Sequence, residues 1–282
     1  MLHRGIELKT GAQIEYMRAA GLVVARTLQR VREAAQAGMT TADLDTMARD
    51  SLREHGATSN FLHYGAERNV PGFPGVMCVS VNDEIVHGIP GNRVLRDGDV
   101  VSVDFGAIVE GWHSDAAITF VVGAADVRTA ELLRVTETAL WRGIAAARLG
   151  GRVSDISHAI GTYIASQGEY GVVREYTGHG IGSSMHQPPD VPNTGRAGRG
   201  AKIVPGLVLA VEPIVTLGSG RARIQADDWT VETVDGSIGA HFEHTFTVTE
   251  SGLWVLSSED GGAADLAALG LPYGGLPYGG TR

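Results

Sequence analysis

The chain begins with two stretches whose apolar residues recur every three or four positions, which is the period of an amphipathic helix. The first covers residues 12–36, and Gly38 ends it, because glycine weakens a helix. In the second, Thr40 is expected to cap the N-terminus, Asp43 stands three residues on, and Gly56 marks the end. The sequence therefore predicts a long helix followed by a shorter one.

The same helical pattern returns in the second half of the chain. Residues 127–148 carry apolar side chains at helical spacing and stop at Gly150. A shorter helix follows, with Ser154 as the candidate cap. The recurrence of a helix pair suggests an internal repeat with halves of about 12–122 and 127–250.

Two apolar runs strengthen this interpretation. "GDVVSVD" (98–104) and "GLVLAVE" (206–212) each start at a glycine and reach a carboxylate six residues later. Unbroken apolar runs of this length are typical of strands that are covered on both faces. Asp104 and Glu212 are therefore expected to occupy equivalent positions in the two halves.

After each of these carboxylates, the chain is expected to turn back and present another. "EGWH" lies near a predicted turn that places Asp115 on the strand beside Asp104. In the second half, Glu243 follows a longer excursion, in which "DDWTVETVDGS" predicts a hairpin with Asp235-Gly236 as its turn. A two-fold arrangement would bring all four carboxylates to one central point.

A glycine-rich stretch, "REYTGHGIGSSMHQPPD" (174–190), holds two histidines seven residues apart, His179 and His186. On a helix both rings would share one face. The glycines around His179 and the prolines at the end instead favour a shaped loop.

Four buried carboxylates must be neutralised, because isolated buried charges are strongly unfavourable. Divalent cations would do so, with Asp115 or Glu243 bridging two ions and His179 supplying a nitrogen ligand. Oxygen-rich ligands with one imidazole suit Mn, Fe, Co or Zn better than calcium. Two such ions, about 3.5–4 Å apart, would activate a water and polarise a carbonyl, which is hydrolytic chemistry.

Other polar residues near this predicted site have simpler interpretations. Any single acidic residue is more often solvated than a ligand. His241 and His244 flank Glu243, and we expect strand alternation to point them to the opposite face in structural roles. Residues near predicted turns or elsewhere outside the site are interpreted as surface residues: His113, Asp228, Glu110 and Glu250.

Composition narrows the classes of protein that fit. The 282 residues are 43% hydrophobic with a net charge of -9, which argues against a general DNA- or RNA-binding protein. The single cysteine, Cys78, excludes an internal disulfide framework and fits a reducing cytoplasm. No apolar run approaches the roughly 20 residues of a membrane span, and the first residues lack the apolar segment of a signal peptide. We expect a cytoplasmic protein that is not membrane-bound.

Five ordered motifs resemble one family. "SVNDEIVHGIP", "VDFG" with Asp115, "TGHGIG…MH", "VEP" and "FEHT" are similar in order and spacing to type I methionine aminopeptidases, a branch of peptidase family M24, over roughly residues 8–255. The resemblance implies the α+β pita-bread fold, in which two pseudo-symmetric halves form a curved antiparallel sheet backed by helices. It also implies a single catalytic domain, 1–255.

The resemblance implies a role for each matching residue. Two divalent ions (Co, Mn, Fe, Zn or Ni) would be held by Asp104, Asp115, His179, Glu212 and Glu243, with Asp115 and Glu243 bridging. Glu212 would also shuttle the proton of the attacking water. His87 and His186 would contact the scissile amide and stabilise the tetrahedral intermediate.

A pocket for the methionine side chain is implied at Phe73, Cys78, Met185 and Trp229, whose apolar walls would suit a flexible thioether. Met185 stands where the family often has phenylalanine. Val70 and Pro71 also depart from the family pattern, in which an aromatic and a polar residue are usual. The alternative is that Phe73 and Cys78 are ordinary core residues.

Two other functions remain open at this stage. X-Pro peptidases of the aminopeptidase P or prolidase type share the fold and ligands but usually carry a large extra N-terminal domain. A binding protein of this fold that lost its chemistry should lack at least one ligand, and all five are present. The expected partners are nascent polypeptides and Met-X peptides, with transient ribosome association, and the expected state is a monomer. The Gly/Pro-rich composition near the C-terminus predicts a flexible tail at 256–282, dispensable for activity after about residue 260.

Overall fold

Four long helices form where the sequence predicts them in the computed structural model, which describes residues 5–67 and 71–275. Thr40 and Asp43 form the expected capping box, and Gly56 ends the second helix with a left-handed φ of 63°. No helix of the described residues is long and apolar enough to cross a membrane. The four helices are α1 (Gly11–Ala34), α2 (Thr41–His55), α3 (Val127–Ala146) and α4 (Val153–Gln167).

The start of α4 differs from the prediction. Arg152, not Ser154, is the N-cap residue, and its backbone N–H donates to the Asp155 carboxylate at 2.8 Å. The Ser154 hydroxyl instead donates to the Arg199 carbonyl at 2.9 Å and accepts from its N–H. Because Ser154 is engaged by this distant loop, Asp155 takes over the capping role.

One nine-stranded sheet carries the main architecture. Along its path the strand order is β1-β4-β5-β14-β9-β7-β8, with β2 paired to β4 and β15 paired to β14, and all of these pairs are antiparallel. Its strands are β1 (Thr58–Ser59), β2 (Met77–Val81), β4 (Val100–Val109), β5 (Trp112–Val121), β7 (Gly178–Gly180), β8 (Gln187–Val191), β9 (Val208–Val211), β14 (Glu243–Thr249) and β15 (Gly252–Val255).

Two three-stranded sheets complete the described structure, β13-β10-β6 and β11-β12-β3. The predicted hairpin around Asp235-Gly236 is wrong, because β12 pairs with β11 and β3, whereas the strand after that turn joins β10. The Asp235 carboxylate accepts from Ser237 N–H, so the turn itself is present. The strands are β3 (Glu84–Val86), β6 (Gly171–Val172), β10 (Ile214–Thr216), β11 (Ala222–Ile224), β12 (Val231–Thr233) and β13 (Gly239–His241).

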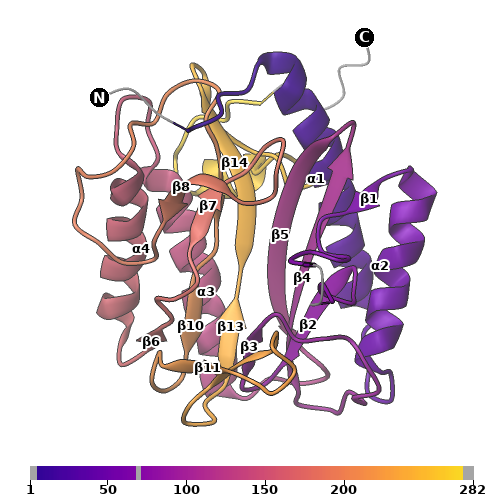
Figure 1. The fold of residues 1–282 in the computed structure, drawn as a ribbon. Helices are drawn as coiled ribbons and strands as arrows, with labels where there is room; N and C mark the ends of the chain where they lie inside the picture. The colour runs from indigo at the N-terminus through magenta and orange to yellow at the C-terminus, as the bar shows by residue number, and fades with distance from the viewer. Residues whose placement is uncertain (1–4, 68–70, 276–282) are drawn as a thin grey trace.

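The two halves meet at the β5–β14 pair. Helices α1 and α2 lie beside the strands of the first half, and α3 and α4 beside those of the second (Figure 1). Each half has its own apolar core, with Val24 and Phe105 in the first and Ile160 and Leu209 in the second. The unbroken apolar runs are thus buried on both faces as expected, and each half of the sheet is backed by a helix pair.

Residues 256–275 correct the prediction of a flexible tail. They contain a short helix, α5 (Ala263–Ala268), and Leu256 and Leu266 are fully buried. The buried Arg18 of α1 donates to the carbonyls of Leu256 and Glu259, both at 2.7 Å. The Gly/Pro-rich composition was misleading because a few apolar side chains and backbone hydrogen bonds are enough to dock this segment. Residues 276–282 lie outside the described residues.

Candidate metal centre and substrate pocket

Neighbouring strands bring the five predicted ligands to one place. Asp104 lies on β4, Asp115 on β5, His179 on β7 and Glu243 on β14, and Glu212 directly follows β9. These strands are consecutive neighbours in the large sheet. The sheet therefore spans the internal repeat and joins carboxylates from both halves.

Strand register explains why the side chains converge. Asp104 and Glu243 both stand opposite Ala117 of β5, one from each side. Asp115 is two residues from Ala117 and points to the same face of the sheet. In the second half His179 pairs with Ala210, two residues before Glu212. Alternation along these five strands therefore places all five side chains on one face.

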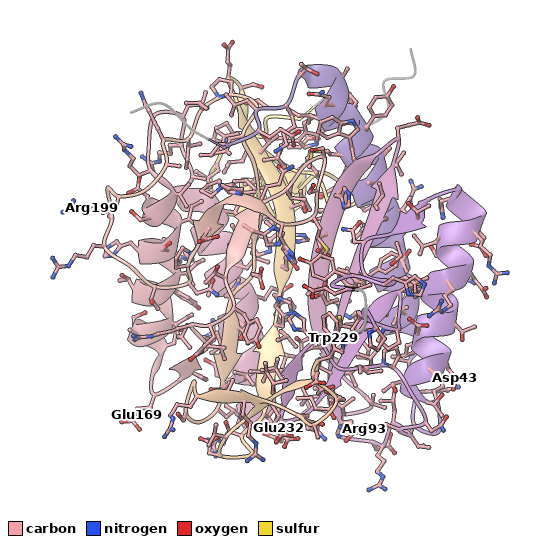
Figure 2. The ribbon with its side chains drawn as sticks, in the orientation of Figure 1. Asp43, Arg93, Glu169, Arg199, Trp229 and Glu232 are labelled. Carbon is pink, nitrogen blue, oxygen red and sulfur yellow. The ribbon has the colours of Figure 1, made fainter. Side chains whose placement is uncertain are left out.

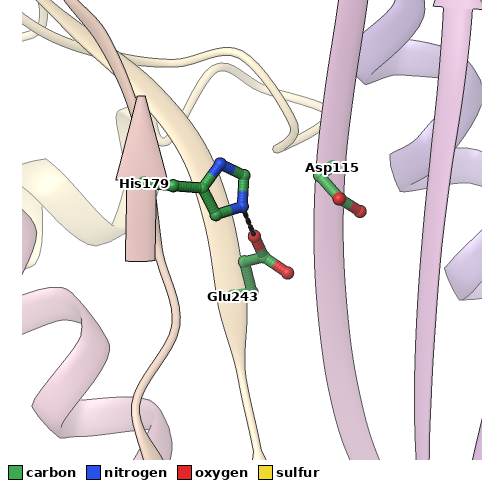
Figure 3. A group of neighbouring side chains, drawn as sticks. All are labelled: Asp115, His179 and Glu243. Atoms are coloured by element: carbon green, nitrogen blue, oxygen red, sulfur yellow. Dashed lines mark ion pairs between the residues drawn. The ribbon is translucent and has the colours of Figure 1, made fainter. Parts of the chain in front are cut away.

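The imidazole of His179 is oriented toward the carboxylates. Its Nδ1 donates to the Gly180 carbonyl at 3.0 Å, so Nε2 carries the lone pair. That Nε2 lies 3.7 Å from Glu212 Oε1 and 3.9 Å from Glu243 Oε1. Figure 3 shows the ring facing Glu243, with Asp115 across from both, and ligand atoms of these three residues lie within 4.8 Å of one another.

The surroundings of the four carboxyl groups disfavour their charged forms, so a nearby positive charge would stabilise them. Burial raises the pKa of Asp104 to about 7 and that of Glu212 to about 8, and it raises the pKa values of Asp115 and Glu243 well above their usual range. One oxygen each of Asp104, Asp115 and Glu243 has no hydrogen-bond partner among the described residues. Burial also lowers the pKa of His179 to about 3, which keeps it a neutral ligand. This donor set fits divalent cations.

Glycines on either side of His179 permit a close backbone approach. A Cβ on Gly178 would lie 2.4 Å from the Ala210 carbonyl oxygen, and one on Gly180 would lie 2.3 Å from that of Pro188. The predicted loop is instead two short strands, β7 and β8, joined by residues 181–186. Pairing with β9 holds His179 in the sheet, which the glycine content of the sequence concealed.

The two other predicted histidines line the same pocket as the ligands. The ring centroid of His186 lies 4.3 Å from that of His179, and its Nδ1 shares a 2.6 Å hydrogen bond with the Tyr64 hydroxyl. When this hydroxyl donates, Nε2 of His186 carries the ring proton and can donate to a substrate oxygen. His87 follows β3 in a left-handed conformation, with φ of 58°, and its ring packs edge-on against Tyr176. Such a φ in a non-glycine residue is typical of functional sites.

Two histidines were placed wrongly from the sequence. His241 is buried, and its Nε2 lies 3.8 Å from Glu212 Oε2. It is two residues from Glu243, and this even spacing puts both side chains on the same face of the chain. His113 is half-buried on β5 rather than on the surface, because residues 182–187 fold over it and its N–H donates to the Gly182 carbonyl at 2.9 Å.

The remaining assignments hold. His244 contacts Ser257 Oγ at 2.9 Å and the ring of Trp141, away from the carboxylates. The three acidic residues expected on the surface are exposed: Glu110, Asp228 and Glu250.

An apolar cluster forms the wall of the pocket beside the carboxylates. Phe73, Cys78 and Met185 are buried and pack with Phe61, and the ring of Trp229 lies edge-on to Phe73 at 5.4 Å between centroids. Figure 2 labels Trp229 below the middle of the molecule. The pocket encloses a cavity of about 100 Å³. All four residues predicted for the methionine side chain therefore lie together.

Sequence reasoning missed Phe61 and Tyr64, which also line this pocket. The only available signal was a pair of aromatic residues ahead of a glycine, in "FLHYGA". Of the two departures from the family pattern in this region, Pro71 is exposed, and Val70 lies outside the described residues.

Comparisons with known proteins agree on one family. Residues 15–250 match the model of metallopeptidase family M24. The methionine aminopeptidase of Clostridium acetobutylicum is 47% identical over 253 residues, covering 89% of this chain and 98% of its own length. Methionine aminopeptidase 1 of Bacillus subtilis is 45% identical over 249 residues, covering 88% and 98%.

Solved structures show the same relationship in three dimensions. The methionine aminopeptidase of Thermotoga maritima superposes with a TM-score of 0.86 at 41% identity, covering 90% of this chain and all of its own. A prolidase from Pyrococcus furiosus reaches a TM-score of 0.69 at 20% identity, and 65% of its length is covered. The second likeness shows a shared fold alone, and the α+β pita-bread architecture expected from the sequence is confirmed.

Proposed function

Because the chain belongs to metallopeptidase family M24 and, within it, to the methionine aminopeptidases, we propose that it removes the N-terminal methionine from polypeptides whose next residue is small. The observation that carries this proposal is the convergence of four carboxylates, two of them buried and two half-buried, and His179 beside an apolar pocket. The alternative function, cleavage of X-Pro peptides, has weaker support, because the likeness to the prolidase lies below 25% identity and shows the fold alone.

The ligands proposed for two divalent ions are Asp104, Asp115, His179, Glu212 and Glu243. Support comes from their unpaired buried oxygens and from the inward-facing Nε2 of His179. Ions bound there would polarise the scissile carbonyl and lower the pKa of a coordinated water. The ion could be Co, Mn, Fe, Zn or Ni, since these ligands accept all of them.

Three residues of the chain are proposed to act on the substrate. Glu212 accepts a proton from the attacking water and returns it to the leaving nitrogen, which is general acid–base work for a carboxylate that lines the pocket. His186 and His87 donate hydrogen bonds to the scissile amide and stabilise the developing negative charge. Burial and the nearby His186 lower the pKa of His87 to about 4, so it acts as a neutral donor.

Specificity is proposed to come from the apolar wall of the pocket. Phe73, Cys78, Met185 and Trp229 present aromatic rings and sulfur atoms to the methionine side chain, and thioethers interact favourably with aromatic rings. Burial raises the pKa of Cys78, so its thiol contributes as an uncharged wall rather than as a nucleophile.

The wider setting is part of the same proposal. We propose a single catalytic domain that acts as a monomer in the cytoplasm on the N-termini of nascent polypeptides, with transient ribosome association. The single cysteine fits a reducing cytoplasm.

A peptide panel tests the activity. Protein purified without added metal is analysed for bound ions and then assayed with Mn²⁺, Co²⁺ or Fe²⁺ on Met-Gly, Met-Ala, Met-Leu and X-Pro peptides. Release of methionine from the first two, and little from Met-Leu, is expected. Cleavage of X-Pro peptides alone, or no release with any ion, would contradict the proposal.

A further inference from the structure

The segment between β7 and β8 carries Met185 and His186 to the pocket. Residues 7–9, called the N-terminal arm below, pack against this segment. Lys9 of this N-terminal arm is 6% exposed, although lysine is rarely buried. Its backbone N–H donates to the Gly206 carbonyl at 2.7 Å, which anchors the arm just ahead of β9. The arm therefore contacts both the chain that leads into β9 and residues 182–187.

Glu7 makes three hydrogen bonds to this segment. Its carboxylate accepts from the backbone N–H of Ser183 at 3.0 Å, from the Ser183 hydroxyl at 2.8 Å and from the side-chain amide of Gln187 at 2.9 Å. Hydrogen bonds to a charged acceptor are stronger than neutral ones. Residues on both sides of Met185 and His186 are thus held by one side chain.

Lys9 contacts both Glu7 and Gln187 and so joins the same network. Its ammonium donates to Gln187 Oε1 at 3.2 Å and to the Glu7 carbonyl at 3.0 Å, and it lies 3.6 Å from Glu7 Oε2. Burial lowers the pKa of Lys9 to about 8 and the nearby Glu7 partly offsets this, so the charge is kept here against a desolvation cost. An apolar residue of the same length would fill the space without that cost, which argues that the ammonium serves a specific purpose.

Gly182 shows how closely the arm and the segment fit. A Cβ at this position would lie 2.2 Å from Lys9 Cε and 2.3 Å from Glu7 Oε2. On the other side, the Gly182 carbonyl accepts from His113 N–H of β5. The segment is therefore held between the arm and the main sheet.

We propose that Glu7 and Lys9 are positioning residues that fix residues 182–187 and thereby hold His186 and Met185 against the substrate. This inference rests on the proposed function, since it assigns a purpose to the placement of those two side chains. Neither Glu7 nor Lys9 lines the pocket, so both act through the segment they hold. A displacement of about 1 Å in a catalytic group can reduce the rate on the order of a hundredfold.

Variants Glu7→Ala and Lys9→Met test the proposal, with Glu15→Ala and Lys202→Met as controls at exposed positions. Each is assayed for kcat and KM on a Met-Ala peptide, for Mn²⁺ affinity by calorimetry and for amide exchange across residues 182–187. We expect kcat to fall about tenfold or more in both test variants, with faster exchange of the Ser183 amide and unchanged Mn²⁺ affinity. The controls should match the wild type in all three measurements. Glu7→Gln, which keeps the shape of the side chain, is the substitute if Glu7→Ala yields too little folded protein. The kcat of Glu7→Gln should lie below that of the wild type and above that expected for Glu7→Ala.

Unchanged exchange of residues 182–187 in both variants would overturn this inference while leaving the proposed function intact. Faster exchange with an unchanged kcat would also overturn it, because the segment would then be free to move without consequence. Loss of Mn²⁺ affinity in parallel with kcat would assign the arm to the metal centre instead. Wild-type protein that releases no methionine would refute the proposed function, and exchange would still report on the contacts.

Discussion

His179 and His186 lie close together, yet their hydrogen bonds assign them different work. The Nδ1 of His179 is occupied by a backbone carbonyl and its Nε2 faces two carboxylates. The Nδ1 of His186 is occupied by Tyr64, and this residue reaches no carboxylate within ion-pair distance among the described residues. One ring is therefore suited to bind a metal and the other to bind substrate.

Substitution should separate these roles. His179→Ala removes an inward-facing nitrogen ligand, so we expect Mn²⁺ affinity to fall by about tenfold or more, with loss of activity. His186→Ala removes a donor to the substrate, so Mn²⁺ affinity should stay within about twofold while kcat falls on the order of a hundredfold. Calorimetric titration with Mn²⁺ beside steady-state kinetics checks both, and a metal-free His186→Ala protein would contradict the division.

The residues that sequence reasoning found and missed differ in a physical way. Asp104 and Glu212 end apolar runs, where a carboxylate is unexpected, so pattern alone marked them. Tyr64 carries no such contrast, because a tyrosine near a glycine is ordinary in any loop. The prediction for His241 was wrong because residues two apart in a strand lie on the same face, so His241 faces the same side as Glu243.

At the scale of elements, helix α1 is tied closely to the chain that follows β15. A Cβ on Gly21 would lie 2.1 Å from the Leu256 carbonyl oxygen, so no side chain fits at this crossing. Gly21 lies within the stretch that the sequence predicts to be helical, but helical periodicity does not reveal what this glycine meets. Contacts between elements far apart in sequence are the part of the fold that periodicity cannot supply.

Gly21→Ala should therefore destabilise the protein although alanine is the better helix former. We expect the free energy of unfolding to fall by about 1–3 kcal/mol, because the backbone at Leu256 must shift to admit the methyl group. Gly11→Ala is the matched control, since a Cβ at Gly11 meets nothing within 4 Å and α1 begins there. Urea denaturation monitored by circular dichroism measures the stability of both variants. Equal stability of the two would contradict the inference that the contact between Gly21 and Leu256 leaves no room for a methyl group.

For the molecule as a whole, four carboxylates at the junction of the halves link stability to pH. Their pKa values are raised in the fold, with Asp104 at about 7 and Glu212 at about 8. Between their unfolded values and these folded values, the folded protein binds more protons than the unfolded chain. The contribution of these carboxyl groups to the stability of the metal-free protein therefore falls as pH rises through this window. Buried histidines such as His241, whose pKa burial lowers to about 3, contribute in the opposite direction below about pH 6.5.

We expect the melting temperature of metal-free protein to fall by about 5 °C or more between pH 6.5 and pH 8, where histidines of the unfolded chain are mostly neutral and the carboxyl groups dominate. Added Mn²⁺ should raise it more at pH 8, where the carboxylates are ionised, than at pH 6.5. Differential scanning calorimetry with and without a chelator makes the comparison. As a control, Asp104→Asn removes one raised pKa and should flatten the pH dependence; a steeper one would contradict the assignment.

The C-terminal segment bears on the stability of the whole molecule rather than on its chemistry. Composition suggested that residues after about 260 are dispensable, whereas the structure buries Leu266 against the second-half core. Leu253 N–H donates to the Pro272 carbonyl at 3.1 Å, and Gly274 N–H donates to the Leu253 carbonyl at 2.7 Å. The segment therefore extends β15 and covers its edge.

Deleting residues 261–282 should consequently lower stability while leaving the catalytic side chains in place. Loss of the buried Leu266 alone costs about 2–5 kcal/mol, and the deletion also exposes the edge of β15. Since none of the pocket residues lies beyond Glu243, kcat at 20 °C should stay within about twofold of the wild type, while inactivation at 45 °C accelerates. Deleting residues 276–282 keeps every contact described for this segment, so this shorter deletion is the comparison. Equal melting temperatures for the two truncated proteins would restore the interpretation of a dispensable tail, because the docked segment would then contribute nothing measurable.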